Sequence, residues 1–234
     1  MATGWKSFDK IYCISLTERT DRRAMATAQF DTIGLSNRVE FLIVERHPTD
    51  CEQGCYESHM ACMKKGLAEG AERILIFEDD IVFDRFSLGL LERARDFCLW
   101  HTGWHMLFLG CMVKASRRTS FPAIRKIKFR SLTHAYAIHR RFAEELVQRP
   151  WQQVPYDDFL RDLKDREIYA LYPSIAFQSN ARSDNERYLP LDRFRRILGG
   201  LRNLQKFDEF YHRRRALIVC AHLLAALLIL WAIR

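Results

Sequence analysis

Short apolar runs and amphipathic stretches alternate along the first part of the chain. Three runs, Lys10–Leu16, Val39–Val44 and Ile74–Phe77, are rich in β-branched and aromatic residues, which predicts strands. Between them, Thr20–Ile33 and the stretch from Cys55 to Gly66 carry apolar residues at helical spacing. The order strand, helix, strand, helix, strand is that of a Rossmann-like α/β half.

Residues typical of helix ends set the limits of these elements. Thr20 is the predicted N-cap of the first helix, and Gly34 follows its last turn. Asp84 is the predicted cap of a third helix that runs to about Cys98. A further strand is expected over Trp104–Leu109.

The third strand ends in three consecutive carboxylates. Glu78, Asp79 and Asp80 follow four apolar residues that suit a strand buried on both faces, and apolar residues resume after them. Such carboxylates repel one another near a core unless a positive charge lies beside them. A hard divalent cation, Mg²⁺ or Mn²⁺, fits both carboxylate oxygens and the carboxyl end of a strand. The alternative is that the acids face water, or that Arg73 and other basic groups neutralise them.

Two other segments carry candidate chemistry. The turn after the first strand is rich in arginine, which can grip a diphosphate through bidentate hydrogen bonds or form a solvated helix face. In the second helix, His59 shares one face with Cys55, Cys62 and Met63. His59 is therefore either a core residue or, together with Ser58, part of a ligand cleft.

Composition narrows the classes of function. The chain has 234 residues, 48% hydrophobic and 28% charged, which is typical of a globular domain with or without an appendage. Its net charge of +8 favours an anionic partner, but no nucleic-acid recognition motif has the right spacing. The seven cysteines include no CxxC pair, which argues against zinc and for reduced thiols in the cytosol. The first ten residues lack the apolar run of a secretory signal.

One segment is basic throughout. Residues 114–130 contain seven lysines and arginines and no acid, with Ile124, Ile127 and Phe129 between the charges. The alternation indicates an amphipathic edge strand, and Pro122 indicates a loop beside it. The segment is either a solvated basic surface or a site for a phosphate-bearing acceptor or an anionic lipid.

The sequence changes character after Ser183. Residues 184–215 are rich in arginine, with helical periodicity over 189–210, which predicts a basic helical linker after a domain of residues 1–183. Residues 216–233 follow three arginines and contain eighteen residues, of which only His222 is polar. A bilayer core requires roughly 17–25 such residues, so this run is predicted to be a transmembrane or membrane-anchoring helix. The positive-inside rule then makes it a single-pass tail anchor with the preceding domain on the cytoplasmic face.

Six short segments match the pattern of one family in the correct order: Ile14–Arg23, Gly54–His59, Ile76–Asp80, Thr133–Ile138, Tyr156–Asp158 and Tyr172–Gln178. Through them the chain resembles glycosyltransferase family 25, the lipopolysaccharide-type sugar transferases related to collagen galactosyltransferases. The chain departs from the family pattern at Leu132, where a glycine is expected, and in the first turn, at Thr17 and Glu18.

The resemblance implies an α/β fold of the GT-A-like Rossmann type, a mixed sheet flanked by helices, here with a C-terminal hydrophobic helix. It implies a UDP-sugar donor carrying a hexose, galactose, and a motif of the Asp-x-Asp type for Mn²⁺ or Mg²⁺. Asp80 is the expected direct metal ligand, and Glu78 or Asp79 is expected to be a second ligand or to hold the ribose, with Glu78 the preferred second ligand. The expected donor-binding residues are Ser15, Leu16, Arg19, Arg22, Ser58, His59, Glu78 and Asp79.

Sugar transfer with inversion also requires a base that takes the proton of the acceptor hydroxyl. The candidates are Asp157 and Asp158, although acids at a helix start are ordinarily caps. The sequence thus predicts a membrane-tethered hexosyltransferase acting on a glycan or glycolipid. One alternative is an inactive tail-anchored protein of the same fold that binds a nucleotide or phospholipid. A metal-dependent phosphohydrolase is weaker, because a second His/Asp ligand cluster is missing from the sequence.

Overall fold

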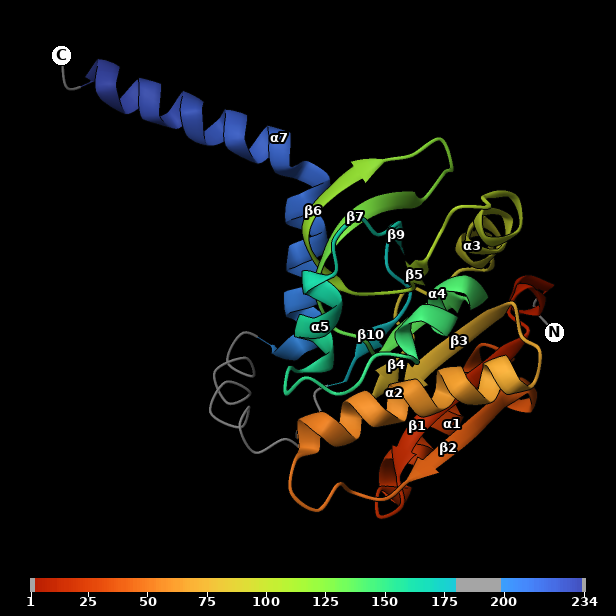
Figure 1. Ribbon diagram of the computed structural model, residues 1–234. Helices are drawn as coiled ribbons and strands as arrows, with labels where there is room; N and C mark the ends of the chain where they lie inside the picture. Colours follow the sequence, from red (N-terminus) through yellow and green to blue (C-terminus); the bar gives the residue numbers. More distant parts are fainter. Residues whose placement is uncertain (1–2, 180–198, 233–234) are drawn as a thin grey trace.

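A mixed sheet of eight strands organises the molecule (Figure 1). The structure is a computed structural model that describes residues 3–179 and 199–232. The strands are β1 (Lys10–Leu16), β2 (Val39–Val44), β3 (Arg73–Glu78), β4 (Ile81–Val82), β5 (Met106–Phe108), β6 (Met112–Arg118), β7 (Ile124–Ser131), β8 (Ala135–His139), β9 (Ile168–Leu171) and β10 (Phe177–Gln178). The helices are η1 (Thr3–Ser7), α1 (Thr20–Thr32), η2 (Ser36–Arg38), α2 (Cys51–Ala68), α3 (Leu88–Trp100), α4 (Arg140–Leu146), α5 (Tyr156–Asp162) and α7 (Gly200–Ala232).

The strand order places a crevice at one edge of the sheet. The order is β2-β1-β3-β8-β5-β9-β7-β6, and β4 pairs separately with β10. The first strand lies between β2 and β3 and is parallel to both. The chain passes from β1 to β2 on one side of β1 and then returns to form β3 on its other side. The loops that leave β1 and β3 therefore diverge at the carboxyl ends of these strands. Open α/β sheets bind ligands in the crevice outside the carboxyl ends of such strands.

Both faces of the sheet are covered, as the apolar run of β3 predicts. Leu75 and Phe77 belong to a buried cluster with residues of α1 and α3. Ile74 and Ile76 point to the opposite face, into a second cluster with residues of α2, α4 and α5. All four side chains are fully buried, which confirms a strand covered on both sides. The large mixed sheet flanked by helices also confirms the α/β class.

Most predicted elements of the first half are present, with two helix starts displaced. The first two strands have the predicted limits, and Gly34 follows α1 with a φ of +66°, which glycine adopts without strain. Thr20 is the first residue of α1 and not its cap. The second helix begins at Cys51, earlier than predicted, because the Asp50 carboxylate accepts hydrogen bonds from two backbone N–H groups of the first turn.

Asp84 does not cap the third helix, which begins after Ser87. Its carboxylate instead accepts hydrogen bonds from Arg202 of α7, at 2.7 and 2.9 Å, and pairs with Lys206. Asp84 therefore links the loop before α3 to α7. The hydrogen bonds from Lys206 and Arg202 hold the pKa of Asp84 below its usual range, although partial burial alone would raise it.

The first half of α7 is packed into the globular body. Gln205 is fully buried, and its side-chain amide donates to the Ala176 carbonyl oxygen at 2.9 Å. Glu209 is almost fully buried, accepts from the Ser174 N–H at 2.9 Å and pairs with Arg85 at 3.2 Å. The part of the predicted linker from 199 to 215 therefore belongs largely to the body. Residues 184–198 lie outside the described residues.

The prediction that residues 216–233 cross a membrane is wrong. No helix in residues 3–179 or 199–232 is long and apolar enough to span a bilayer. A hydrocarbon core about 30 Å thick requires about 20 residues. Arg215 and Arg234 enclose only eighteen, and His222 is among them. Residues 216–232 continue α7 beyond the body (Figure 1). The predicted tail anchor with its cytoplasmic orientation is wrong as well.

Candidate functional site

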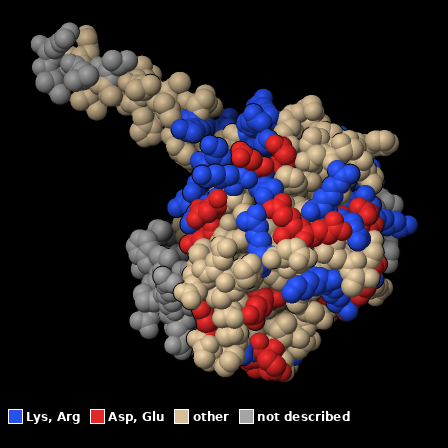
Figure 2. All heavy atoms as spheres, in the orientation of Figure 1, with Lys and Arg blue, Asp and Glu red and all other residues tan. Residues whose placement is uncertain are grey.

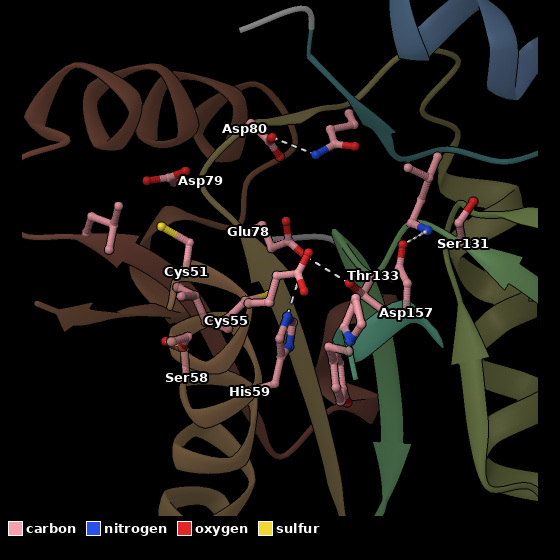
Figure 3. Close-up of a pocket in the computed structure, with 18 of the residues that line it drawn as sticks. Cys51, Cys55, Ser58, His59, Glu78, Asp79, Asp80, Ser131, Thr133 and Asp157 are labelled. Atoms are coloured by element: carbon pink, nitrogen blue, oxygen red, sulfur yellow. Dashed lines mark hydrogen bonds and ion pairs between the residues drawn. The ribbon is translucent and has the colours of Figure 1, made fainter. Parts of the chain in front are cut away.

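A cavity of about 550 Å³ lies outside the carboxyl ends of β1 and β3, a size typical of small-molecule sites. The loop after β2, the start of α2, the β7–β8 loop and the start of α5 complete its walls. Figure 3 shows the acidic end of β3 facing α2 on one side and Asp157 on the other. All but one of the predicted site residues line this cavity: Ser15, Leu16, Arg22, Ser58, His59, Glu78, Asp79, Asp80, Asp157 and Asp158.

Arg19 is the predicted site residue that does not line the cavity. It occupies the N-cap position of α1, and its guanidinium group donates to the Asp21 carboxylate at 3.0 Å. That hydrogen bond lowers the pKa of Asp21 to about 2. Arg22, in the first turn of α1, lines the cavity instead, and its guanidinium group reaches the Asp79 carboxylate.

Glu78 is held between two side chains. The Thr133 hydroxyl donates to Glu78 Oε1 at 3.1 Å, and His59 Nε2 lies 3.5 Å from the same oxygen (Figure 3). Burial alone would raise the pKa of Glu78, but the hydrogen bond and charge of His59, together with Thr133, outweigh it and lower the pKa. Glu78 is therefore an ionised carboxylate at the centre of the site.

His59 is fixed by aromatic residues on its other side. Its Nδ1 lies 3.0 Å from the Tyr136 hydroxyl, which in turn lies 2.9 Å from the Tyr156 hydroxyl. The imidazole also stacks on Tyr156 with ring centroids 4.3 Å apart. His59 was predicted to be either a core residue or part of a ligand cleft. It is both, because its side chain is buried and also lines the cavity beside Glu78.

Asp79 is bound by one residue of β1 and one of α1. The Ser15 hydroxyl donates to Asp79 Oδ2 at 2.6 Å, and Arg22 Nη1 donates to Oδ1 at 3.3 Å. Burial raises the pKa of Asp79, and Ser15 and Arg22 oppose that rise. The positive charge that the acidic triplet requires is thus supplied in part by Arg22. Arg73 does not supply it, since its guanidinium pairs with Asp9 at 3.3 Å.

Asp80 has one satisfied and one unsatisfied oxygen. Its Oδ2 accepts from the Gln178 amide at 2.8 Å and lies 3.9 Å from Arg22 Nη1. Its Oδ1 is buried without a hydrogen-bond partner in the described part of the chain. Burial and the nearby Glu78 charge raise the pKa of Asp80 to about 7.

The carboxylates fit a divalent cation, with the substrate as a co-ligand. The described residues contain no group of three His, Cys, Asp or Glu side chains arranged to hold a metal ion. Mg²⁺ and Mn²⁺ at phosphate sites commonly use only one or two protein carboxylates, and phosphate oxygens and water complete the shell. The unpartnered Asp80 Oδ1 is an oxygen of this kind, and Glu78 lies two residues before it in the same short segment. The metal site remains a prediction.

The two candidate bases differ sharply in environment. Asp157 Oδ2 accepts from the Leu132 N–H at 2.9 Å, whereas its Oδ1 is buried without a partner in residues 3–179 and 199–232. Burial raises the pKa of Asp157 to about 6, although the Leu132 N–H opposes the rise. Asp158 is more exposed and pairs with Arg161 at 2.5 Å. These environments favour Asp157 as a base and Asp158 as a residue that stabilises the first turn of α5.

The backbone conformation of Leu132 is one that favours glycine, the residue that the family pattern has at this position. Its φ is +78°, in the left-handed region where glycine is favoured and other residues are strained. This backbone directs the Leu132 N–H at Asp157, and the leucine side chain is buried, which offsets the strain. A site function is the usual reason for a strained residue to be kept at a cavity wall.

Two residues that hold the carboxylates, Thr133 and Gln178, were not predicted from the sequence. Thr133 binds Glu78, and Gln178 binds Asp80 across the β4–β10 ladder. Both lie inside the segments that match the family pattern, which is the signal that could have identified them. Neither residue type is diagnostic by itself, since Thr and Gln are ordinary surface residues.

The raised pKa of Asp80 predicts a pH-dependent stability. The folded state holds this proton up to about pH 7, whereas an unfolded Asp releases it near 3.9. The stability that the protonated Asp80 contributes to the folded state is therefore fully present below about pH 4 and is lost as the pH rises to about 7. In chelator, the free energy of unfolding of wild type minus that of Asp80→Asn should fall by up to about 1.4 kcal/mol per pH unit in this range. Urea unfolding of both proteins at pH 5 and pH 8 measures it, and a pH-independent difference would contradict the burial of an ionisable Asp80.

Comparison with known proteins gives a consistent result. A family model described as glycosyltransferase family 25 (LPS biosynthesis protein) matches residues 37–160. The protein named inactive glycosyltransferase 25 family member 3 of Homo sapiens is 28% identical over 191 residues, covering 68% of this chain and 32% of that protein. Procollagen galactosyltransferase 2 of Mus musculus is 25% identical over 173 residues, covering 68% of this chain and 27% of that protein.

The chain thus spans about a third or less of the length of these relatives. Among solved structures, A197 from STIV is 12% identical with a TM-score of 0.49, covering 72% of this chain and 85% of that one. The family model covers more than half of the chain and includes α2, the acidic end of β3 and the start of α5. Because those are the segments that build the cavity, sequence and geometry agree, and the chain belongs to glycosyltransferase family 25.

Proposed function

We propose that the protein is a glycosyltransferase that moves a hexose, galactose, from a UDP donor to a hydroxyl of a glycan or glycolipid acceptor, with inversion. One observation carries the proposal. Two carboxylates, Asp80 and Asp157, line one cavity, and each has a buried oxygen without a hydrogen-bond partner in the described residues. Leaving such oxygens unsatisfied costs stability, so substrate, metal or acceptor is the reason to keep them.

The donor end of the cavity is the end of β1 and the acidic triplet. Ser15, Leu16 and Arg22 line it, and Arg22 supplies a fixed guanidinium group near the position proposed for the diphosphate. Bound at Asp80 and Glu78, Mn²⁺ or Mg²⁺ would neutralise the negative charge that the departing diphosphate gains. His59 and Thr133 hold Glu78 ionised and oriented for that purpose.

The acceptor end of the cavity contains Asp157. In the proposed reaction the acceptor oxygen bonds to the anomeric carbon while the bond from that carbon to the diphosphate breaks. The hydroxyl proton passes to Asp157 Oδ1, and the electron pair of the broken bond leaves with the diphosphate. A carboxylate with a pKa of about 6 is ionised at neutral pH and still basic enough to assist this step. The Leu132 N–H on Oδ2 keeps Asp157 oriented.

A second candidate is a protein of this fold that binds the nucleotide sugar without transferring it. It is favoured by Arg22, which already lies against Asp79 and Asp80 where a metal would otherwise balance their charge. It also agrees with the name of the human relative, which is described as inactive. The retained Asp80 and Asp157 favour the transferase, because a binding protein has no use for a base.

A screen of nucleotide sugars by thermal shift and calorimetry, with and without Mn²⁺, tests the proposal. UDP-galactose is expected to stabilise the protein, by about 2.7 kcal/mol at a hundredfold excess over its dissociation constant. Arg22→Lys keeps the charge beside Asp79 but loses the fork of donors, so it should weaken donor binding, whereas Arg19→Lys should not. Release of UDP with metal titration then separates the two candidates. Binding without turnover would leave the binding protein, and no stabilisation by any nucleotide sugar would reject both.

A further inference from the structure

A second, smaller cavity is lined by residues other than those of the cavity that contains the carboxylates. It measures about 270 Å³ and is enclosed by the β6–β7 hairpin, the loop after β9 and the middle of α7. Arg118 and Arg125 of the hairpin and Arg213 of α7 line it, with Phe121 and Tyr172 as aromatic walls. None of its lining residues lines the larger cavity. It is therefore a separate site that the proposed chemistry does not use.

The charged side chains that line this cavity in the described chain are all positive. Its lining residues within the described chain include three arginines and no acid. Arg118, Arg125 and Arg213 have no carboxylate partner in the described part of the chain, whereas their neighbour Lys126 pairs with Glu167. Figure 2 shows Lys and Arg side chains gathered where α7 leaves the body.

The hairpin that forms the cavity carries unfavourable pairs. In the antiparallel register of β6 and β7, Arg118 lies directly opposite Arg125, and Arg117 lies opposite Lys126. Like charges in such positions repel and destabilise a hairpin. Nothing in the fold requires them, because exposed positions of an edge hairpin accept either sign or none. The repulsion is offset if an anion occupies the space between the guanidinium groups.

One of the three arginines, Arg125, is also held in place. The Arg125 guanidinium lies over the Tyr172 ring, 5.2 Å from its centroid, a contact that orients it at the cavity wall. The nearest acids on α7 are occupied elsewhere, since Asp208 accepts from the Val113 N–H at 3.0 Å and Glu209 accepts from the Ser174 N–H. These carboxylates anchor the helix and do not line the cavity.

We propose that this cavity is a binding site for an oxyanion, a phosphate monoester group, carried by the acceptor. Guanidinium groups arranged as forks bind phosphate through paired hydrogen bonds. Leu201 lines the larger cavity and Arg213 the smaller one, twelve residues apart on α7, which corresponds to about 18 Å along the helix. An extended glycan with a phosphate at one end can therefore reach both. The acceptor assignment rests on the proposed transferase function, but the oxyanion site does not.

Titration of the full chain with inorganic phosphate at low ionic strength, followed by amide NMR shifts, tests the site. Residues that line only the larger cavity, such as Ser58 and Thr133, are followed in the same titration, so that binding there is distinguished. Shifts should concentrate on 118–125, 172–173 and 213. In the double variant Arg118→Gln and Arg125→Gln, the dissociation constant should rise by about tenfold or more, as loss of charge-assisted hydrogen bonds implies. The matched control, Arg117→Gln with Lys128→Gln, removes the same charge from the same hairpin outside the cavity and should change it less than about twofold.

The variants also give a readout that does not require the ligand. Removal of the Arg118–Arg125 repulsion should raise the thermal midpoint of the phosphate-free protein at low salt. Phosphate should raise the midpoint of wild type and of the control variant, but not that of Arg118→Gln with Arg125→Gln. Equal loss of affinity in both double variants, or shifts spread over the basic surface, would overturn the site in favour of non-specific attraction. Glucose 6-phosphate binding well and glucose not at all would support a phosphorylated glycan, whereas inorganic phosphate binding without glucose 6-phosphate would remove the acceptor from the proposal. Both results hold whether or not the protein transfers sugar.

Discussion

Asp80→Asn is expected to lower sugar transfer by about 10²–10³-fold, the range found when a group that stabilises transition-state charge is removed. The substitution keeps the size of the side chain and its hydrogen bond from Gln178, but it removes the unpartnered, buried Oδ1 charge. The variant should stay folded and should lose the response of the thermal midpoint to Mn²⁺. Transfer rates and Mn²⁺ titrations of the purified full chain measure both effects.

Asp84→Asn is the matched control for that experiment. Asp84 lies four residues later, outside the cavity, and contacts Arg202 and Lys206. Its loss should reduce stability and leave turnover per folded molecule nearly unchanged. A folded Asp80→Asn protein with near-normal turnover in chelated buffer would show that Asp80 does not hold a metal.

Asp157→Asn is expected to lower turnover by about 10²–10⁴-fold with the affinity for donor almost unchanged, because general base catalysis contributes on this scale. The asparagine oxygen still accepts from the Leu132 N–H, so the wall of the cavity is preserved. In wild type, turnover should rise with pH through about pH 6, as Asp157 loses its proton and becomes able to accept another. That acid limb should be missing from the variant.

Asp158→Asn separates catalysis from helix capping. Its carboxylate is partly exposed and paired with Arg161, so the expected loss is a few tenths of a kcal/mol in stability and little in turnover. A fall in turnover for Asp158→Asn as large as that for Asp157→Asn would transfer the role of base to Asp158. If Asp157→Asn and Asp158→Asn both lose stability but not turnover, the two carboxylates serve only to cap α5.

The segments that fold from local signals were predictable from the sequence. An apolar run that is buried on both faces made β3 recognisable, and β-branched residues with clear borders gave the limits of β1 and β2. Helix starts were less predictable. Asp50 and Asp84 are both acids before a helical pattern, and only the tertiary structure gives Asp84 the competing partners Arg202 and Lys206.

The chemistry at the acidic triplet was predicted only in part. The repulsion among Glu78, Asp79 and Asp80 was evident from the sequence, but the cation that lies beside two of them, Arg22, is 57 residues away from Asp79 along the chain. Pairing of the parallel strands β1 and β3 brings them together, and no local pattern encodes that distance. For the same reason, the unpartnered oxygens of Asp80 and Asp157, which carry the proposed function, are properties of packing.

For the C-terminal run, the sequence predicted a feature that the structure does not have. Hydropathy made Ala216–Ile233 a predicted membrane span, but the run is short and contains His222, and no helix of the described residues is long and apolar enough to cross a bilayer. The sequence by itself determined the α/β class, the family and the residues available for chemistry, since these depend on local propensity and on short motifs. Tertiary structure decided which acid is buried, which is paired, where the cation lies and that α7 begins as part of the body. Burial and long-range pairing set the free energy of a charge, and both exist only once the chain is folded.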